Sequence, residues 1–130
     1  MKIYTDSMIP FTYVVNVTCN ANAIGSAVLQ LDNSSDFVLT NVFAVSSQDN
    51  PLQPSPYNFD VIFSDTGTSR QFMNDYVPQP LLAGNAFNGT PEDARITFIK
   101  NTNLNINVRN KVGSTNIVTV AFKGYKVFNI

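Results

Sequence analysis

The chain contains no histidine and no tryptophan, and Cys19 is its single cysteine. Without histidine, neither the common zinc and haem ligand sets nor the Ser-His and Cys-His pairs of hydrolases can be assembled. Glu92 is the one glutamate, so a carboxylate pair of the glycosidase type would need aspartates. Every aspartate except Asp60 stands in a turn-like context. We therefore expect a protein that is not an enzyme and that has no cofactor and no metal site.

Charge is also scarce. Only 13% of the residues are charged, about half the usual fraction of a quarter. The 17 asparagines, with many serines and threonines, predict a neutral, hydrogen-bonding surface that suits contact with other proteins. The basic residues of the second half are scattered, which argues against nucleic-acid binding. They are Arg70, Arg95, Lys100, Arg109, Lys111, Lys123 and Lys126.

The few charges are divided unevenly along the chain. Residues 1–65 hold Lys2 against six aspartates, whereas residues 66–130 hold seven basic residues against three acidic ones. This division could mark a self-complementary or stacked arrangement of subunits. We favour the simpler interpretation that strands from the two halves interleave, so that the halves of the sequence are not halves of the surface.

Long apolar runs are missing as well. No stretch approaches the 18 or so apolar residues that a transmembrane helix needs. Lys2 is not followed by a continuous apolar segment of the signal-peptide type, because Asp6, Ser7, Pro10 and Thr12 interrupt it. We expect a soluble, unprocessed chain that does not bind a membrane. A length of 130 residues is enough for one domain with one core.

Alternation of apolar and polar residues is the main structural signal. It is strictest over residues 11–19, where Cys19 shares the apolar face with Val15 and Val17 and is expected to be a small buried hydrophobe. Similar segments predict further strands at 27–31, 37–46, 58–64, 96–98, 103–109 and 116–128. We therefore expect an all-β fold, an antiparallel β-sandwich or jelly-roll-like domain of about seven to eight strands.

Details of three strands refine this expectation. The segment 37–46 has apolar residues on both faces, which predicts a central strand. Gly25 is interpreted as a breaker before the strand at 27–31. Gly124 interrupts the last strand and indicates a bulge or a close approach of another backbone. Residues 1–10 are expected to form an N-terminal arm and residues 11–130 the sandwich domain, with a strand of the domain's own sheet as the alternative for the arm.

The segments between strands carry turn and loop signals. Three prolines in 49–57 predict an extended loop. Residues 72–91 form a loop long enough to suggest a function. Asp32, Asn33 and Asp36 offer oxygen ligands for calcium, but they are equally typical of a hairpin turn, which is the interpretation we favour.

Carbohydrate binding is an alternative function that the tyrosines keep open, because β-sandwich modules often stack sugar rings on exposed aromatic side chains. Tyr4, Tyr57 and Tyr76 lie in loop-like stretches and could serve in this way. Tyr13 and Tyr125 alternate with core positions and are expected to be packed.

Several segments together resemble a known class of proteins. They are 64–70, 77–84 and 116–128, with Gly25 and 32–37. In pattern, over most of the chain, they look like small β-sandwich auxiliary or decoration proteins of tailed-bacteriophage virions. The resemblance implies a structural protein, made in the host cytoplasm, that binds the major capsid protein or other virion proteins as an oligomer or symmetric array. A place at the head-tail junction or in the tail is also compatible.

The arm and the long loop are the expected contact surfaces. Arg70 follows a turn and could bridge to a partner, although a local pairing with Asp65 is the alternative we favour. The candidate contact residues are Ile3, Tyr4, Met8, Tyr57, Arg70, Tyr76, Leu81 and Leu82.

Overall fold

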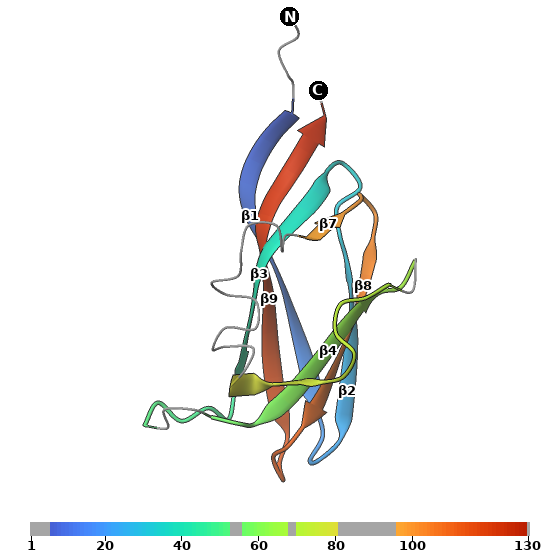
Figure 1. Cartoon of the computed structure of the whole chain (residues 1–130). Coiled ribbons are helices and arrows are strands. Elements are labelled where there is room, and N and C mark those ends of the chain that lie inside the picture. Colours follow the sequence, from blue (N-terminus) through green and yellow to red (C-terminus); the bar gives the residue numbers. More distant parts are fainter. Residues whose placement is uncertain (1–5, 53–55, 68–69, 81–95, 130) are drawn as a thin grey trace, which may run out of the picture.

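A computed structural model of the chain describes residues 6–52, 56–67, 70–80 and 96–129. These residues form two antiparallel sheets packed face to face (Figure 1), which confirms the predicted all-β sandwich. The first sheet has the order β1 (Asp6–Cys19), β9 (Asn116–Asn129), β3 (Asp36–Ser46), β7 (Ile96–Phe98). The second has the order β2 (Ile24–Gln30), β8 (Asn103–Asn110), β4 (Phe59–Asp65), β5 (Arg70–Gln71), and β6 (Val77–Pro78) also pairs with β4. The described residues include no helix that is long and apolar enough to cross a membrane.

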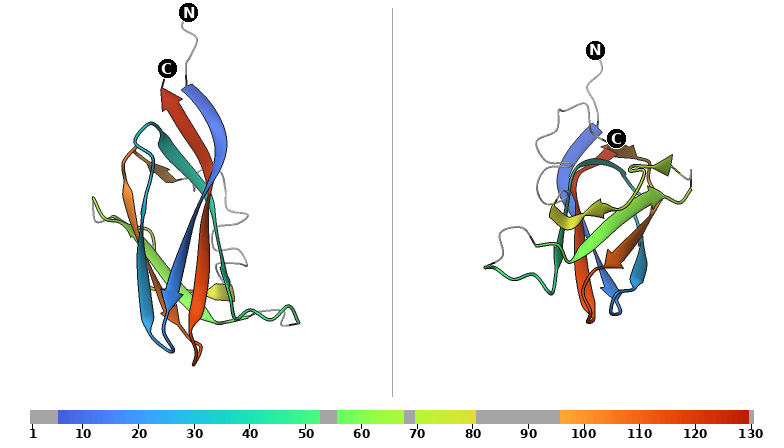
Figure 2. Two further views of the ribbon diagram at one scale, coloured as in Figure 1. Left: turned by 180° about the vertical axis from the view of Figure 1, so that it is seen from behind. Right: turned by 60° about the horizontal axis from the view of Figure 1, so that its bottom comes forward.

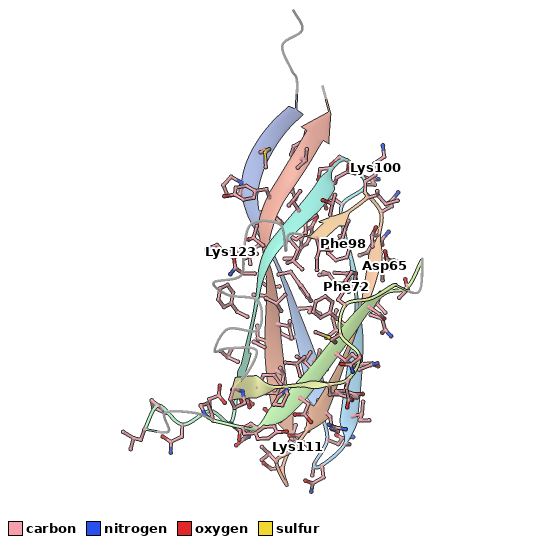
Figure 3. The ribbon with its side chains drawn as sticks, in the orientation of Figure 1. Asp65, Phe72, Phe98, Lys100, Lys111 and Lys123 are labelled. Carbon is pink, nitrogen blue, oxygen red and sulfur yellow. The ribbon has the colours of Figure 1, made fainter. Side chains whose placement is uncertain are left out.

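The core lies between the sheets and is rich in aromatic rings. The largest fully buried side chains are five phenylalanines, Phe37, Phe59, Phe63, Phe98 and Phe122. Each such burial contributes about 2–3 kcal/mol relative to an exposed ring. The loop after β5 joins this core through Phe72, whose ring lies 5.4 Å from that of Phe63 and 5.2 Å from that of Phe98 (Figure 3). The first part of the expected loop 72–91 is therefore anchored to the sandwich, and residues 81–91 lie outside the described residues.

The interior position of β3 is as predicted, but its pattern has another cause. The register against β9 shifts between Leu39 and Asn41, so the strand contains a bulge. Phe37 and Leu39 are buried before the shift, and Val42 and Ala44 are buried after it. One extra residue changes which positions face the core. The apolar residues that seemed to lie on two faces therefore lie largely on one buried face. Odd-numbered positions form it before the bulge and even-numbered positions form it after the bulge.

Gly25 was expected to break the chain before a strand, and this prediction is wrong because Gly25 lies inside β2. A Cβ atom at this position would lie 2.7 Å from the carbonyl oxygen of Thr18 and 2.8 Å from the Sγ atom of Cys19. The glycine therefore lets β2 pack closely against β1. Cys19 is buried as predicted, with its Sγ atom 3.7 Å from the carbonyl oxygen of Val108, and burial raises the pKa of its thiol.

The expected N-terminal arm is partly a strand. Residues 6–10 begin β1 and pair with residues 125–129 of β9, as the own-sheet alternative requires. Residues 1–5, with the candidate contacts Ile3 and Tyr4, lie outside the described residues. The start of β1 and the end of β9 extend past the second sheet (Figures 1 and 2), and β3 pairs with the other side of β9 as far as Val127.

Acidic residues of the first half of the sequence form ion pairs with basic residues of the second half. Asp32 of the acidic half forms an ion pair with Lys126 of the basic half, and Asp60 pairs with Arg109 in the same way. Strands from the two halves alternate in both sheets. The interleaving that we favoured therefore accounts for the asymmetry.

Gly124 of β9 is the tightest point of the first sheet. A Cβ atom there would lie 1.9 Å from the carbonyl oxygen of Val38, so the Gly124→Ala variant must displace backbone. We expect it to lower the free energy of unfolding by about 3 kcal/mol, measured by urea denaturation. Gly113→Ala is the matched control, because its Cβ atom would make only ordinary contact with Asn22. Equal stability of the two variants would contradict this account of β9.

Candidate functional site

Ionisable side chains meet at the end of the sandwich where Lys111 is labelled in Figure 3. We call this group the Asp60 cluster; it consists of Tyr57, Asp60, Tyr76, Arg109 and Lys111. Asp60 of β4 stands opposite Arg109 of β8 in the strand register, and its side chain is 1% exposed. Phe59 and Val61 point into the core, so strand alternation turns the side chain of Asp60 between them away from the core. The side chain of Asp60 is instead buried by the other members of the Asp60 cluster.

The carboxylate of Asp60 is fully engaged. Its Oδ2 atom accepts hydrogen bonds from Nε of Arg109 at 2.8 Å and from Nη2 at 2.5 Å. Its Oδ1 atom accepts the hydroxyl of Tyr57 at 2.7 Å. The Nζ atom of Lys111 lies 3.5 Å from Oδ2, and the guanidinium of Arg109 stacks 4.5 Å above the ring of Tyr76. The cluster is a hydrogen-bonded ion pair between two tyrosines.

These contacts shift the pKa values of the groups in opposite directions. Burial acts to raise the pKa of Asp60, but the hydrogen bonds from Tyr57 and Arg109 and the charges of Arg109 and Lys111 outweigh it, so that the pKa is lowered. The hydrogen bond to Asp60 is the main cause that raises the pKa of Tyr57. It is likewise the main cause that raises the pKa of Arg109. Asp60 is thus a stable carboxylate, poorly suited to accept a proton from a substrate.

A second polar network ties the neighbouring loops together around Asp49. Its carboxylate accepts hydrogen bonds from Nε2 of Gln79 at 2.8 and 2.9 Å, from Nδ2 of Asn58 at 2.7 Å and from the backbone N–H of Ser46 at 3.0 Å. Gln79 is 2% exposed and accepts the backbone N–H of Asn58 through Oε1. Burial acts to raise the pKa of Asp49, but these donors lower it overall. The segment that directly follows β6 is therefore fixed to the turn that follows β3.

Two asparagines extend this network into the turn before β9. Asn116 is fully buried; its Nδ2 donates to Oδ1 of Asn110 at 3.1 Å and its Oδ1 accepts the hydroxyl of Ser46 at 2.6 Å. Asn110 donates to the carbonyl oxygens of Asn20 and Ser114. Composition assigned asparagine to the solvent-facing surface, and for Asn110 and Asn116 that assignment is wrong. Satisfied buried amides make this end of the sandwich well defined.

A different surface lies on the outside of the first sheet. Its members are exposed or partly exposed apolar side chains of β1, β3 and β9, which we call the outer apolar face: Val14, Phe43, Val45, Ile117 and Ala121. Val14 and Phe43 both pair with Ala121, so these three residues form one row across the strands. The bulge in β3 is what turns Phe43 and Val45 outward. The exposed cation Lys123 follows Ala121 on the same side of β9 and borders this face.

The structure brings together only some of the predicted contact residues. Tyr57, which is 48% exposed, and Tyr76 both belong to the Asp60 cluster, whereas Met8, 54% exposed, lies near the start of β1 opposite Val127 of β9. Arg70 pairs through its backbone with Asp65. Leu81 and Leu82, like Ile3 and Tyr4, lie outside the described residues. Sequence reasoning missed Arg109 and Lys111 as partners of Asp60, although Asp60 had stood out as the aspartate within a strand.

The turn at 32–36 uses its carboxylates inside the fold. Asp32 pairs with Lys126, and Oδ1 of Asp36 accepts the backbone N–H of Lys100 at 2.9 Å. In the described part of the chain, no three acidic or cysteine side chains gather as a metal site would require. These contacts support the turn interpretation.

No known family model, curated protein or solved structure matches this chain.

The ion pair of Asp60 predicts a pH-dependent contribution to stability. The folded-state pKa of Asp60 is lowered, so its contribution is present above the unfolded pKa of about 4 and is lost as the pH falls through the folded pKa. Asp60→Asn should lower the free energy of unfolding at neutral pH by about 2 kcal/mol. In urea titrations, the difference from the parent chain should shrink as the pH is lowered.

Asp32→Asn is the control for this experiment, because the Asp32 side chain is 46% exposed in its pair with Lys126. An exposed pair contributes about 1 kcal/mol or less. The pH-dependent contribution assigned to Asp60 would be contradicted in two cases. In one, Asp60→Asn lowers the free energy of unfolding no more than Asp32→Asn does; in the other, the effect of Asp60→Asn does not vary with pH.

Proposed function

We propose that this chain is a non-enzymatic structural protein of a bacteriophage virion that binds the capsid shell as an auxiliary or decoration protein. One observation carries the proposal: the carboxylate of Asp60 is saturated by internal partners, while the outer apolar face is left exposed. The ionisable groups of the Asp60 cluster are engaged with one another, and the exposed apolar surface of the first sheet suits protein contact.

The outer apolar face has the properties of an interface core. Interface cores are depleted of charge and enriched in apolar side chains, and Val45 and Val14 are 59% and 56% exposed. Between them, Thr119 donates its hydroxyl to Oδ1 of Asn16 at 2.7 Å. This polar pair is already satisfied and can be covered without leaving an unpaired group.

The turn after β3 offers a second contact. Leu52 is 89% exposed on a segment that projects from the sandwich (Figure 1). The Asp49 network fixes the base of this segment, so that docking costs little additional ordering. A leucine held in this way can insert into a pocket of a neighbouring protein, as anchoring side chains of interfaces do.

Purified virions test the proposal directly. We expect peptides of this chain in gradient-purified particles by mass spectrometry, and we expect the purified chain to cosediment with shells that lack it. Val45→Asp should reduce cosedimentation about tenfold or more, since it buries a charge in the contact. Ile99→Asp, which changes a 68% exposed side chain away from that face, should not. Absence from virions would refute the location, and binding to tails but not heads would favour the tail alternative.

Carbohydrate binding is the second candidate, because Tyr57 and Tyr76 flank the pair of Asp60 and Arg109. Against it, both oxygens of Asp60 are occupied and Arg109 covers one face of the Tyr76 ring. If it is correct, a glycan array should give signals that Tyr57→Ala or Tyr76→Ala abolishes. An array without such signals would remove this candidate.

A further inference from the structure

The longest uncharged stretch of the sequence is residues 7–31, which contains no lysine, arginine, aspartate, glutamate or histidine. It includes β1 from Ser7 onward and the whole of β2. The uncharged stretch thus covers all of β2 and all of β1 except its first residue, Asp6.

These two strands lie at the same side of the sandwich. β1 is the edge of the first sheet and β2 is the edge of the second, and the turn at 20–23 connects them. Gly25 lets β2 approach β1 closely, and Figure 2 shows the two strands next to each other. We call this side the β1–β2 edge.

The β1–β2 edge also concentrates exposed apolar side chains. It holds six of the twelve large apolar side chains that are exposed in the described part of the chain. They are Met8, Ile9, Phe11 and Val14 of β1, with Ile24 and Val28 of β2. Val14 is shared with the outer apolar face, and Ile24 and Val28 lie on the outside of the second sheet. The nearby cation Lys126 is turned inward, with its Nζ atom 3.6 Å from the centre of the Phe11 ring and paired with Asp32.

The edge of β1 lacks most of the features that keep exposed edges from pairing. Natural edge strands carry lysines, prolines, bulges or covering segments. In β1 the register against β9 runs from Asp6 to Cys19 without a shift, and Pro10 is the one interruption. From Phe11 to Cys19, the backbone is a regular strand whose outer side has no partner strand in the described part of the chain.

We propose that the β1–β2 edge is a self-association interface, in which β1 strands of two copies pair antiparallel about a two-fold axis. A neutral edge against an identical one leaves no charge unpaired. A two-fold axis perpendicular to the sheet places even-numbered residues of one β1 opposite even-numbered residues of the other. Opposed side chains then point to the same side of the joined sheet, so the outer apolar face of each copy stays on the outside. The first sheets of the two copies become one continuous sheet.

The lengths of the strands favour pairing of β1 with β1 of a second copy over a head-to-tail contact, in which β1 would pair with the opposite side of the next copy. On the opposite side, within the described residues, β7 has three residues, and β5 and β6 have two each. Pairing with those strands would form few hydrogen bonds. The β1 strand of another copy provides the same uncharged edge from Phe11 to Cys19, which matches it in length.

The size of the contact is adequate for a modest dimer. Nine paired residues span about 30 Å, and two sheets about 10 Å apart with their side chains give a width of roughly 20 Å. The buried area is then on the order of 600 Å² per subunit, below the standard interface of about 800 Å². The inference rests on the proposed function in that it names one of the protein contacts such a structural protein makes.

Light scattering and sedimentation equilibrium of the purified full-length chain test the proposal. We expect a concentration-dependent species of twice 14.3 kDa. Val14→Lys should raise the dimer Kd about tenfold or more, because it places a charge beside the pairing edge. Val45→Lys is the matched control, since it makes the same change at a similarly exposed site on β3. A monomer at all concentrations, a trimer, or equal effects of the two variants would overturn the proposal.

Hydrogen exchange gives a second readout that does not depend on a variant. Amides of residues 11–19 should exchange more slowly at high protein concentration than at low concentration, whereas those of 103–110 in the interior strand β8 should not change. Exchange independent of concentration would overturn the dimer. A monomer that is present in virions would refute this inference and leave the proposed function standing, and a dimer absent from virions would do the reverse.

Discussion

The close approach of Gly124 to the backbone of Val38 is the constraint on which the first sheet depends. It lies next to the bulge in β3, where the register shifts between Leu39 and Asn41. On one side of the shift Phe37 fills the core, and on the other side Val42 does. Because of the same shift, Phe43 and Val45 face outward. A local irregularity of one residue therefore determines both what the core contains and what the surface presents.

The sequence predicted the features that depend on a period of two. Alternation over 11–19 and 103–109 identified β1 and β8 because each has one buried face. It could not identify the phase change in β3, because a bulge is set by the opposing strand and not by the residues that contain it. Gly25 was misinterpreted for a related reason: a glycine that permits close packing has the same local signature as one that ends a strand.

The candidate site was only partly predictable. Asp60 stood out as an aspartate within a strand, but its partner Arg109 is 49 positions away and nothing local connects the two. Composition could not separate buried asparagines such as Asn116 from surface ones, because burial depends on partners supplied by other loops. Tyr57 and Tyr76 were noticed as exposed aromatics, and the hydrogen bond and the stacking that engage them follow from tertiary structure alone.

The pairing of β1 with β9 also affects the order in which the chain can fold. Asn16 of β1 accepts a hydrogen bond from Thr119, 103 positions later, so β1 leaves the ribosome well before its partner strand β9 is synthesised. During that interval residues 7–19 form an uncharged, strand-prone segment that is not yet paired with β9, and such segments aggregate. A host with abundant chaperones, or rapid translation of the later strands, should therefore improve the yield of soluble chain.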